Sequence, residues 1–106
     1  MIGGLSERIA IEQRVRMGDT GGGATVSWSA LATVWAKVTA RPRGEDAESE
    51  GRRALTVFEL TIRRRTDVTA AMRAVWRGRA LYFRGIADEG PHQPYLRILA
   101  DDGDPL

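Results

Sequence analysis

The segment Thr56–Ala100 alternates between apolar and polar residues with a period of two, and this alternation constrains the fold more than any other feature of the sequence. A period of two is the pattern of a β-strand that buries one face and exposes the other. Three runs show it most clearly; their apolar positions are Phe58, Leu60 and Ile62, then Met72, Ala74 and Trp76, then Leu96, Ile98 and Ala100.

A fourth run, Ala80–Ile86, follows the second after only a short interruption at Arg77-Gly78. A glycine at that point supplies the positive φ that tight hairpin turns require, so we predict a turn there between two antiparallel strands. Gly90, Pro91 and Pro94 separate this run from the last one, because they cannot lie inside a central strand. Thr56–Ala100 is therefore predicted to contain four strands.

The first half of the chain adds further strands. Ile9, Ile11 and Val15 would share one face of a strand, with Glu12 and Arg14 on the other. Between residues 26 and 38 every even position is apolar. Two interpretations fit this stretch: one long strand, or a turn near residues 29–31 followed by a strand over residues 33–40. We favour the turn.

Residues 41–54, RPRGEDAESEGRRA, are rich in charge and glycine and lack strand character, so they predict a long loop. A short helix around Asp46–Arg53 is compatible with this composition. Together the runs predict an all-β fold: a single domain over residues 1–106, built as a small antiparallel β-barrel or sandwich of about six strands. Closure is favoured because it removes the exposed edges of an open sheet.

Composition excludes several classes of function. The chain has no cysteine and hence no disulfide or thiolate metal site. No apolar run approaches the roughly 20 residues of a membrane span, and the start MIGGLSERI lacks the pattern of a signal peptide, so we expect synthesis in the cytoplasm and no membrane partner. The net charge of +2 is only a weak sign of nucleic-acid affinity, because acidic residues are spread almost as widely as basic ones.

No catalytic or cofactor motif is complete. The GDTGGGA run lacks the Lys-Ser/Thr of a phosphate-binding loop, and His92, the sole histidine, lies in a loop without the partners of a zinc site. No serine has the context of a nucleophile. We therefore expect a protein that is not an enzyme and needs no metal or cofactor.

Six pieces of the sequence form an ordered set of motifs that spans nearly the whole chain: Leu5–Gln13, Trp28, Val34–Val38, Ile62–Val68, Trp76–Ile86 and Tyr95–Leu99. Their order resembles that of the head-tail joining proteins of tailed bacteriophages, also called head-closure or stopper proteins, which occur as well in prophages and gene transfer agents. One departure is Arg64, where that family often has an aromatic residue.

The resemblance implies a structural protein of the virion neck, assembled in the host cytoplasm. It would form a six- or twelvefold ring beneath the portal and adaptor proteins, close or gate the channel, and dock the tail terminator or tail tube protein. Double-stranded DNA would pass through the ring without sequence specificity.

The resemblance also implies that the loop Arg41–Arg53 projects toward the channel. An acidic crest between basic flanks would repel phosphates as DNA passes. The alternative is a solvated loop whose charges only keep it soluble. The residues of this predicted DNA-facing gating loop are Arg41, Arg43, Glu45, Asp46, Glu48, Glu50, Arg52 and Arg53.

Two further groups are candidates. Glu59, Arg63, Arg65 and Asp67 are predicted to form inter-subunit contacts, the alternative being ordinary solvent-facing side chains. Trp28, Trp35 and Trp76 are predicted to be core or interface anchors rather than base-stacking residues.

The alternative function is a small nucleic-acid-binding barrel of the oligonucleotide-binding type. Such a protein should show aromatic residues interleaved with lysine or arginine on one exposed face. The local sequence around Trp76 and Tyr82 fits this pattern poorly. An assembly or scaffold protein unrelated to phage is a third interpretation.

Overall fold

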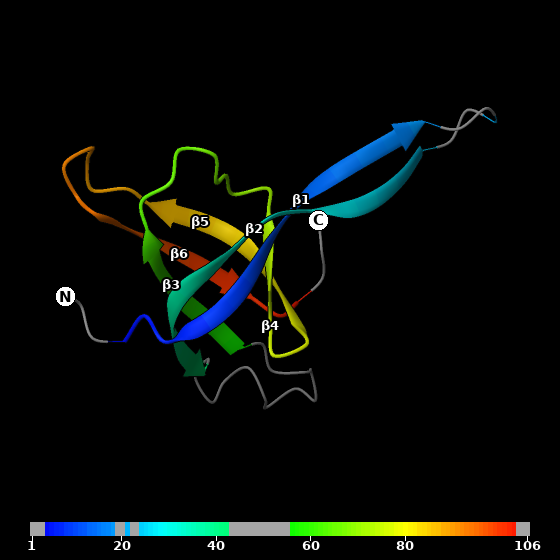
Figure 1. The fold of residues 1–106 in the computed structure, drawn as a ribbon. Coiled ribbons are helices and arrows are strands. Elements are labelled where there is room, and N and C mark those ends of the chain that lie inside the picture. Colours follow the sequence, from blue (N-terminus) through cyan, green and yellow to red (C-terminus); the bar gives the residue numbers. More distant parts are fainter. Residues whose placement is uncertain (1–3, 19–20, 22–23, 43–55, 104–106) are drawn as a thin grey trace.

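Six strands, each antiparallel to its neighbours, close into a barrel in the order β1-β2-β3-β6-β5-β4 (Figure 1). The structure is a computed structural model and describes residues 4–18, 21, 24–42 and 56–103. The predicted all-β barrel is thus confirmed, and the described residues include no helix that could span a bilayer. The strands are β1 (Glu7–Gly18), β2 (Ala24–Pro42), β3 (Thr56–Arg63), β4 (Arg73–Trp76), β5 (Arg79–Ala87) and β6 (Tyr95–Asp101).

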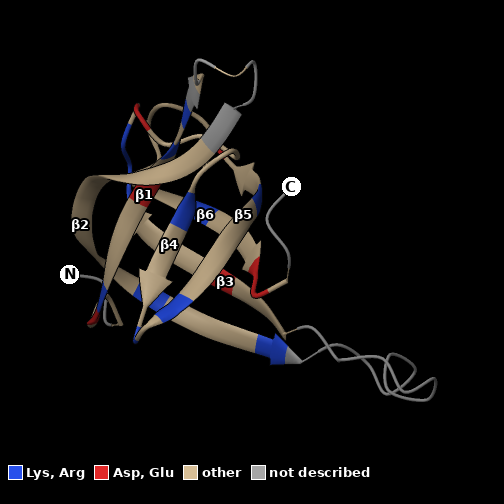
Figure 2. Cartoon of the chain, turned by 90° about the vertical axis from the view of Figure 1, so that its right-hand side faces the viewer, with Lys and Arg blue, Asp and Glu red and all other residues tan. Residues whose placement is uncertain are grey.

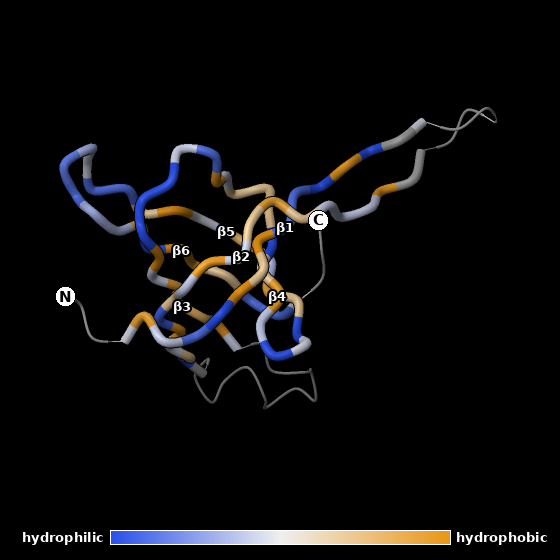
Figure 3. The backbone as a smooth tube through the Cα atoms, viewed as in Figure 1, coloured by the Kyte–Doolittle hydropathy of each residue, from blue (hydrophilic) through white to orange (hydrophobic). Residues whose placement is uncertain are grey.

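The core fills the barrel with the apolar positions of the alternating strands. Figure 3 shows how apolar and polar residues alternate along the backbone of these strands. Phe58, Leu60 and Ile62 of β3 are all buried, as the period of two predicts, and so are their counterparts on β6. The described part of the chain has no buried polar or charged side chain. The complete set of buried residues is Ile9, Ile11, Ala36, Phe58, Leu60, Ile62, Met72, Ala74, Leu81, Phe83, Leu96, Ile98 and Ala100.

The favoured turn near residues 29–31 is wrong, because β2 runs unbroken through this region. The irregularity there is a β-bulge: Ile11 pairs with Ala32 and Glu12 with Ala30, which leaves Leu31 as an extra residue. A bulge bends a strand without ending it, and one extra residue reverses which face the following side chains occupy. On β2, even-numbered residues therefore face inward after Leu31 and outward before it. The sequence does not reveal this change of face, because the even positions are apolar on both sides of Leu31.

Beyond this bulge, β1 and β2 leave the barrel as a hairpin arm, defined here as residues 13–18 and 24–29 (Figure 1). Within the arm the two strands pair only with each other, since β1 pairs with β4 no farther than Glu12 and β2 pairs with β3 only from Ala36 onward. An isolated two-stranded hairpin is marginal in water. The arm is consequently the part of the described structure with the least support from the barrel.

The predicted turn between β4 and β5 is confirmed at Arg77-Gly78, where φ is 51° and 78°. Two successive positive φ angles are the signature of a type I′ hairpin turn, whose twist matches that of the strands it joins. Arg77 adopts this conformation without being a glycine. A second bulge, between Phe83 and Gly85, leaves Arg84 as an extra residue of β5.

The predicted loop over 41–53 begins later than expected, because Arg41 and Pro42 still belong to β2, where they pair with Val57 and Thr56. The β3 partner strand supplies backbone hydrogen-bonding positions that the local composition does not reveal. The rest of that loop, with its predicted short helix, lies outside the described residues.

Candidate functional site

Every carboxylate in the described part of the chain forms an ion pair. Of the 14 acidic residues, six (Asp19, Glu45, Asp46, Glu48, Glu50 and Asp104) lie outside it, which leaves eight. Each of the eight pairs with a different arginine, so acidic and basic residues intersperse over the surface (Figure 2). The pairs are Glu7–Arg77, Glu12–Arg73, Glu59–Arg41, Asp67–Arg65, Asp88–Arg64, Glu89–Arg97, Asp101–Arg84 and Asp102–Arg79.

This pairing shows where positive charge remains uncompensated. Arg8, Arg16, Lys37 and Arg63 have no carboxylate of the described residues within ion-pair distance. Arg16 lies on the hairpin arm, whereas the other three lie on the barrel. Within the described part of the chain, positive charge is therefore in local surplus at these four positions.

Two of the three barrel cations, Arg8 and Arg63, belong to an exposed row of arginines and aromatic rings. Arg8 of β1 pairs with Trp35 of β2, and its guanidinium lies 4.7 Å from the centre of the indole. Continuing the β2–β3 register one residue beyond Ala36–Ile62 places Trp35 beside Arg63. Arg63 pairs in turn with Tyr95 of β6, with the guanidinium 6.0 Å from the ring centre.

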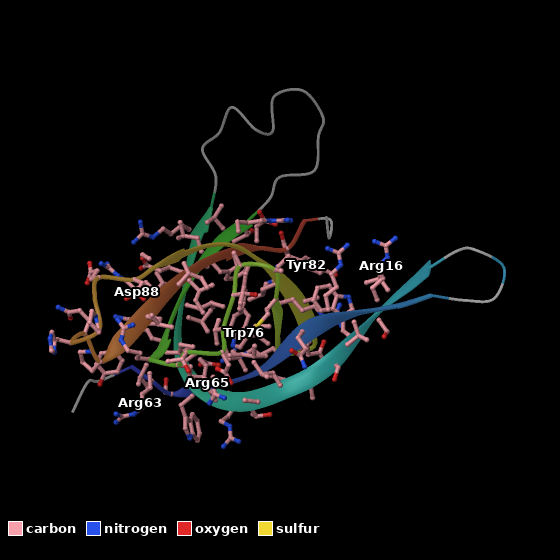
Figure 4. All side chains as sticks on the ribbon, turned by 90° about the horizontal axis from the view of Figure 1, so that it is seen from above. Arg16, Arg63, Arg65, Trp76, Tyr82 and Asp88 are labelled. Atoms are coloured by element: carbon pink, nitrogen blue, oxygen red, sulfur yellow. The ribbon has the colours of Figure 1, made fainter. Side chains whose placement is uncertain are left out.

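We call Arg8, Trp35, Arg63 and Tyr95 the cation–aromatic row. It crosses four neighbouring strands on the outer face of the barrel, and Arg63 projects outward from it (Figure 4). Trp35 is 51% exposed, an unusual position for so large an apolar ring. Lys37 lies two residues beyond Trp35 on the same exposed face of β2.

A second group of similar residues lies at the base of the arm, and it includes its own acid. Trp28 packs against Tyr82 with ring centres 5.9 Å apart, and the Arg73 guanidinium lies 4.4 Å from the centre of the indole. Glu12 accepts a hydrogen bond from Arg73 Nε at 2.7 Å. We call Glu12, Trp28, Arg73 and Tyr82 the arm-base cluster.

The arm-base cluster borders a groove of about 190 Å³ between the arm and the barrel. Ala70 and Ala71 line it together with Trp28, Tyr82 and side chains of Arg14 and Arg84. The groove is open to solvent, and Arg14, Trp28, Tyr82 and Arg84 are the residues of its lining that carry polar side-chain groups.

Trp76 occupies a third environment, at the end of the barrel (Figure 4). It packs against the core, edge-on to Phe58 with ring centres 5.7 Å apart, and its indole N–H donates to Glu7 at 3.0 Å. That hydrogen bond, supported by the Arg77 guanidinium, holds the pKa of Glu7 below its usual value. Trp76 thus has a packing role that Trp35 lacks.

Arg64 and Arg65 differ sharply from Arg63, although the three residues are consecutive. Arg64 holds the loop before β6 in place: its Nε donates to the carbonyl of Gln93 at 2.6 Å, and its guanidinium also binds Asp88 at 2.6 Å and the carbonyl of Gly90. The Arg64 hydrogen bond lowers the pKa of Asp88 to about 2. Arg65 binds Asp67 through two hydrogen bonds and lowers the pKa of that carboxyl.

The predicted site residues thus fall into separate places. Arg41 lies at the end of β2 and pairs with Glu59 at 3.4 Å, while the rest of the predicted gating loop, residues 43–53, lies outside the described residues. Of the four residues predicted to form inter-subunit contacts, Glu59, Arg65 and Asp67 have ion-pair partners within the chain, and Arg63 lies over the ring of Tyr95 without an ion-pair partner among the described residues.

Local sequence reasoning missed the cation–aromatic row, because its members are far apart in the chain and meet only through the order of the strands. The alternation of the sequence placed Arg63 and Tyr95 at outward-facing positions of their strands, but it did not show which residues of neighbouring strands lie beside them. The described residues contain no group of three or more metal-ligating side chains. Their chemistry is that of a binding surface: permanent cations and aromatic rings on a rigid barrel wall.

The fold and these surfaces define a small, rigid barrel equipped for contacts with macromolecules. The sequence model of the phage head completion protein family matches residues 1–103, so the chain belongs to this family and is a structural protein of the virion head and neck. As a virion component it associates with other virion proteins.

Solved structures share the fold. The protein SF1141 from Shigella flexneri 2a, solved in solution, is 29% identical, with 96% of each chain covered and a TM-score of 0.73. A chain of the virion of a native gene transfer agent particle has the same fold, with a TM-score of 0.69, 22% identity and coverage of 95% of this chain and 96% of that one. A comparison with curated proteins finds no match.

Proposed function

We propose that this chain assembles as a ring at the portal vertex after DNA packaging, where it closes or gates the DNA channel and presents the surface to which the tail docks. The observation that carries the proposal is the match to the phage head completion family over residues 1–103. The ring would be six- or twelvefold, with portal and adaptor proteins above and a tail terminator or tail tube protein below.

The hairpin arm supports a ring because its two strands pair only with each other beyond the barrel. A neighbouring copy that covers the arm would supply the burial that an isolated hairpin lacks. Ring contacts through Glu59, Arg65 and Asp67 would have to replace ion pairs that these residues already make within the chain. The arm therefore offers contact between copies at a smaller cost.

The gating part of the proposal concerns the acidic stretch of the loop after β2, as read from the sequence. Carboxylates directed at DNA repel phosphates, which keeps the polymer from adhering during passage. Deleting residues 46–51 should let DNA leak from completed heads. The matched control is Asp46→Asn with Glu48→Gln and Glu50→Gln, which keeps the length of the loop and removes three charges.

The experiment mixes purified protein with DNA-filled, tailless heads that carry portal and adaptor, and measures the fraction of DNA protected from nuclease. We expect wild-type protein to raise protection above buffer and to permit tail attachment. Heads completed with the neutralised variant should retain DNA if the length of the loop closes the channel. They should lose DNA if the charge of the loop closes it. Equal protection with wild-type protein and with buffer would reject the joining role; full protection by the deletion variant would reject gating by this loop alone.

A further inference from the structure

We propose that the cation–aromatic row, together with Lys37, binds the phosphodiester backbone of nucleic acid, and that Trp35 stacks on unpaired bases where the ligand is single-stranded. This assigns Arg63 to nucleic acid rather than to a contact between copies. The proposal concerns the isolated protein and does not depend on ring formation or head completion.

The first step of the argument is charge. Arg8, Lys37 and Arg63 lie on one face of the barrel without a carboxylate partner among the described residues. The described carboxylates nearest in sequence to Arg8 and Arg63 are already bound, since Glu7 is held by Arg77, Glu59 by Arg41 and Asp67 by Arg65. Arginine is charged at every physiological pH and suits phosphate. The face therefore attracts anions without having to break an ion pair.

The second step is spacing. Neighbouring strands lie about 4.8 Å apart, so Arg8 and Arg63, which are two strands apart, are separated by roughly 10 Å across the sheet. That distance is about the axial length of three nucleotides of a DNA strand. Because the row runs across the strands as a strip, its cations can follow successive phosphates of one backbone.

The third step is the aromatic rings. Surfaces that bind single strands without sequence preference combine a basic groove with rings on which bases stack. Although Arg8 lies over its ring, Trp35 remains 51% exposed, so the indole of Trp35 is accessible to a ligand. Aromatic residues interleaved with arginine on one exposed face are the pattern expected of a nucleic-acid-binding barrel, and the row has it.

Two other occupants fit less well. A second copy offers no unpaired carboxylate among the described residues, because all eight are bound to arginines. A different protein would normally require an apolar patch inside a polar rim. The large apolar residues that are exposed in the described structure are scattered singly over two strands: Val26 and Trp35, far apart on β2, and Leu99 on β6.

The test is fluorescence anisotropy with a labelled 24-nucleotide single strand and the matching duplex, measured over a range of NaCl concentrations. The variant is Arg8→Gln with Lys37→Gln and Arg63→Gln. The matched control is Arg41→Gln with Arg77→Gln and Arg79→Gln, which changes the net charge equally at exposed arginines that have acid partners. Thermal unfolding followed by circular dichroism checks that each variant folds.

We expect the row variant to bind both probes at least tenfold more weakly than wild type, and its salt dependence to fall by about three phosphate contacts, one for each cation removed. The control should lose less than threefold. Trp35→Ala should weaken binding of the single strand and leave the duplex unchanged. Equal binding by wild type and the row variant, or no salt-dependent binding by wild type, would overturn the proposal.

A second measurement applies even if the row variant does not fold. Addition of the single strand to wild-type protein should shift the indole N–H signal of Trp35 in the NMR spectrum and leave that of Trp76 in place. A Trp35→Ala variant that binds DNA normally but fails to complete heads would show that the row contacts a protein instead, and would also overturn the proposal.

Discussion

The arm-base cluster and the cation–aromatic row both combine arginine with Trp and Tyr, but only the arm-base cluster includes an acid, and only its Trp packs against a second ring. In the arm-base cluster Glu12 binds Arg73, which in turn lies over Trp28. In the row Arg8 and Arg63 lie over Trp35 and Tyr95 with no carboxylate among the described residues. On the proposed account, arginine beside an aromatic ring marks a binding surface only where no carboxylate of the described residues neutralises its charge.

The largest expected difference is in stability. Trp28→Ala should lower the free energy of unfolding by about 2 kcal/mol, because Trp28 joins the arm to Tyr82 and Arg73 of the barrel. Trp35→Ala should lower it by only about 0.5 kcal/mol, because half of that side chain is exposed. Urea unfolding of both variants measures the comparison; equal losses would remove the distinction between the two groups.

Neutralising Glu12 should make the arm-base cluster resemble the row. Glu12→Gln leaves the partly buried Arg73 without its carboxylate and should reduce the free energy of unfolding by about 1 kcal/mol. Glu59→Gln is the control, because it removes an acid from a more exposed, longer ion pair, and it should cost less than about 0.5 kcal/mol. The anisotropy assay should also show tighter DNA binding by Glu12→Gln. A greater loss of stability in Glu59→Gln than in Glu12→Gln would contradict the stabilising role assigned to the Glu12–Arg73 ion pair.

The smallest effect concerns Arg64, the neighbour of Arg63, which is held by Asp88. Since the pKa of Asp88 is lowered from 3.8 to about 2, the contact stabilises the loop above pH 4 and is lost as pH falls through 2. The protection factor of the Arg64 amide, whose N–H donates to the carbonyl of Pro94 at 2.8 Å, should fall over that range. In Arg64→Ala the protection factor of the amide at position 64 should be low at every pH. Unchanged protection of the Arg64 amide in wild-type protein down to pH 2 would contradict the stabilising role of the Arg64–Asp88 ion pair.

The sequence was sufficient for the strands whose faces alternate cleanly, since the buried positions of β3 and β6 follow from period alone. It was insufficient at Leu31, because a bulge and a turn both interrupt a strand pattern and only pairing with β1 distinguishes them. The start of the long loop was misplaced for a similar reason, as β3 extends β2 to Pro42.

The surfaces were harder to predict than the fold. The row depends on four strands that are adjacent in the barrel but distant in the chain, so no local pattern could assemble it. The pairing of Arg64 with Asp88 likewise joins residues on either side of two strands. The family, by contrast, could be identified from the order of motifs, because that order persists whatever the contacts between them.

A reconstruction by electron microscopy of heads completed with this protein tests the account most directly. We predict a ring of copies at the portal vertex in which each arm lies against a neighbouring barrel and Trp35 and Arg63 face the density of the DNA. No ring at the vertex would contradict the head-closure role. A ring in which Trp35 and Arg63 are buried against another protein would leave that role intact and contradict the assignment of the row to nucleic acid.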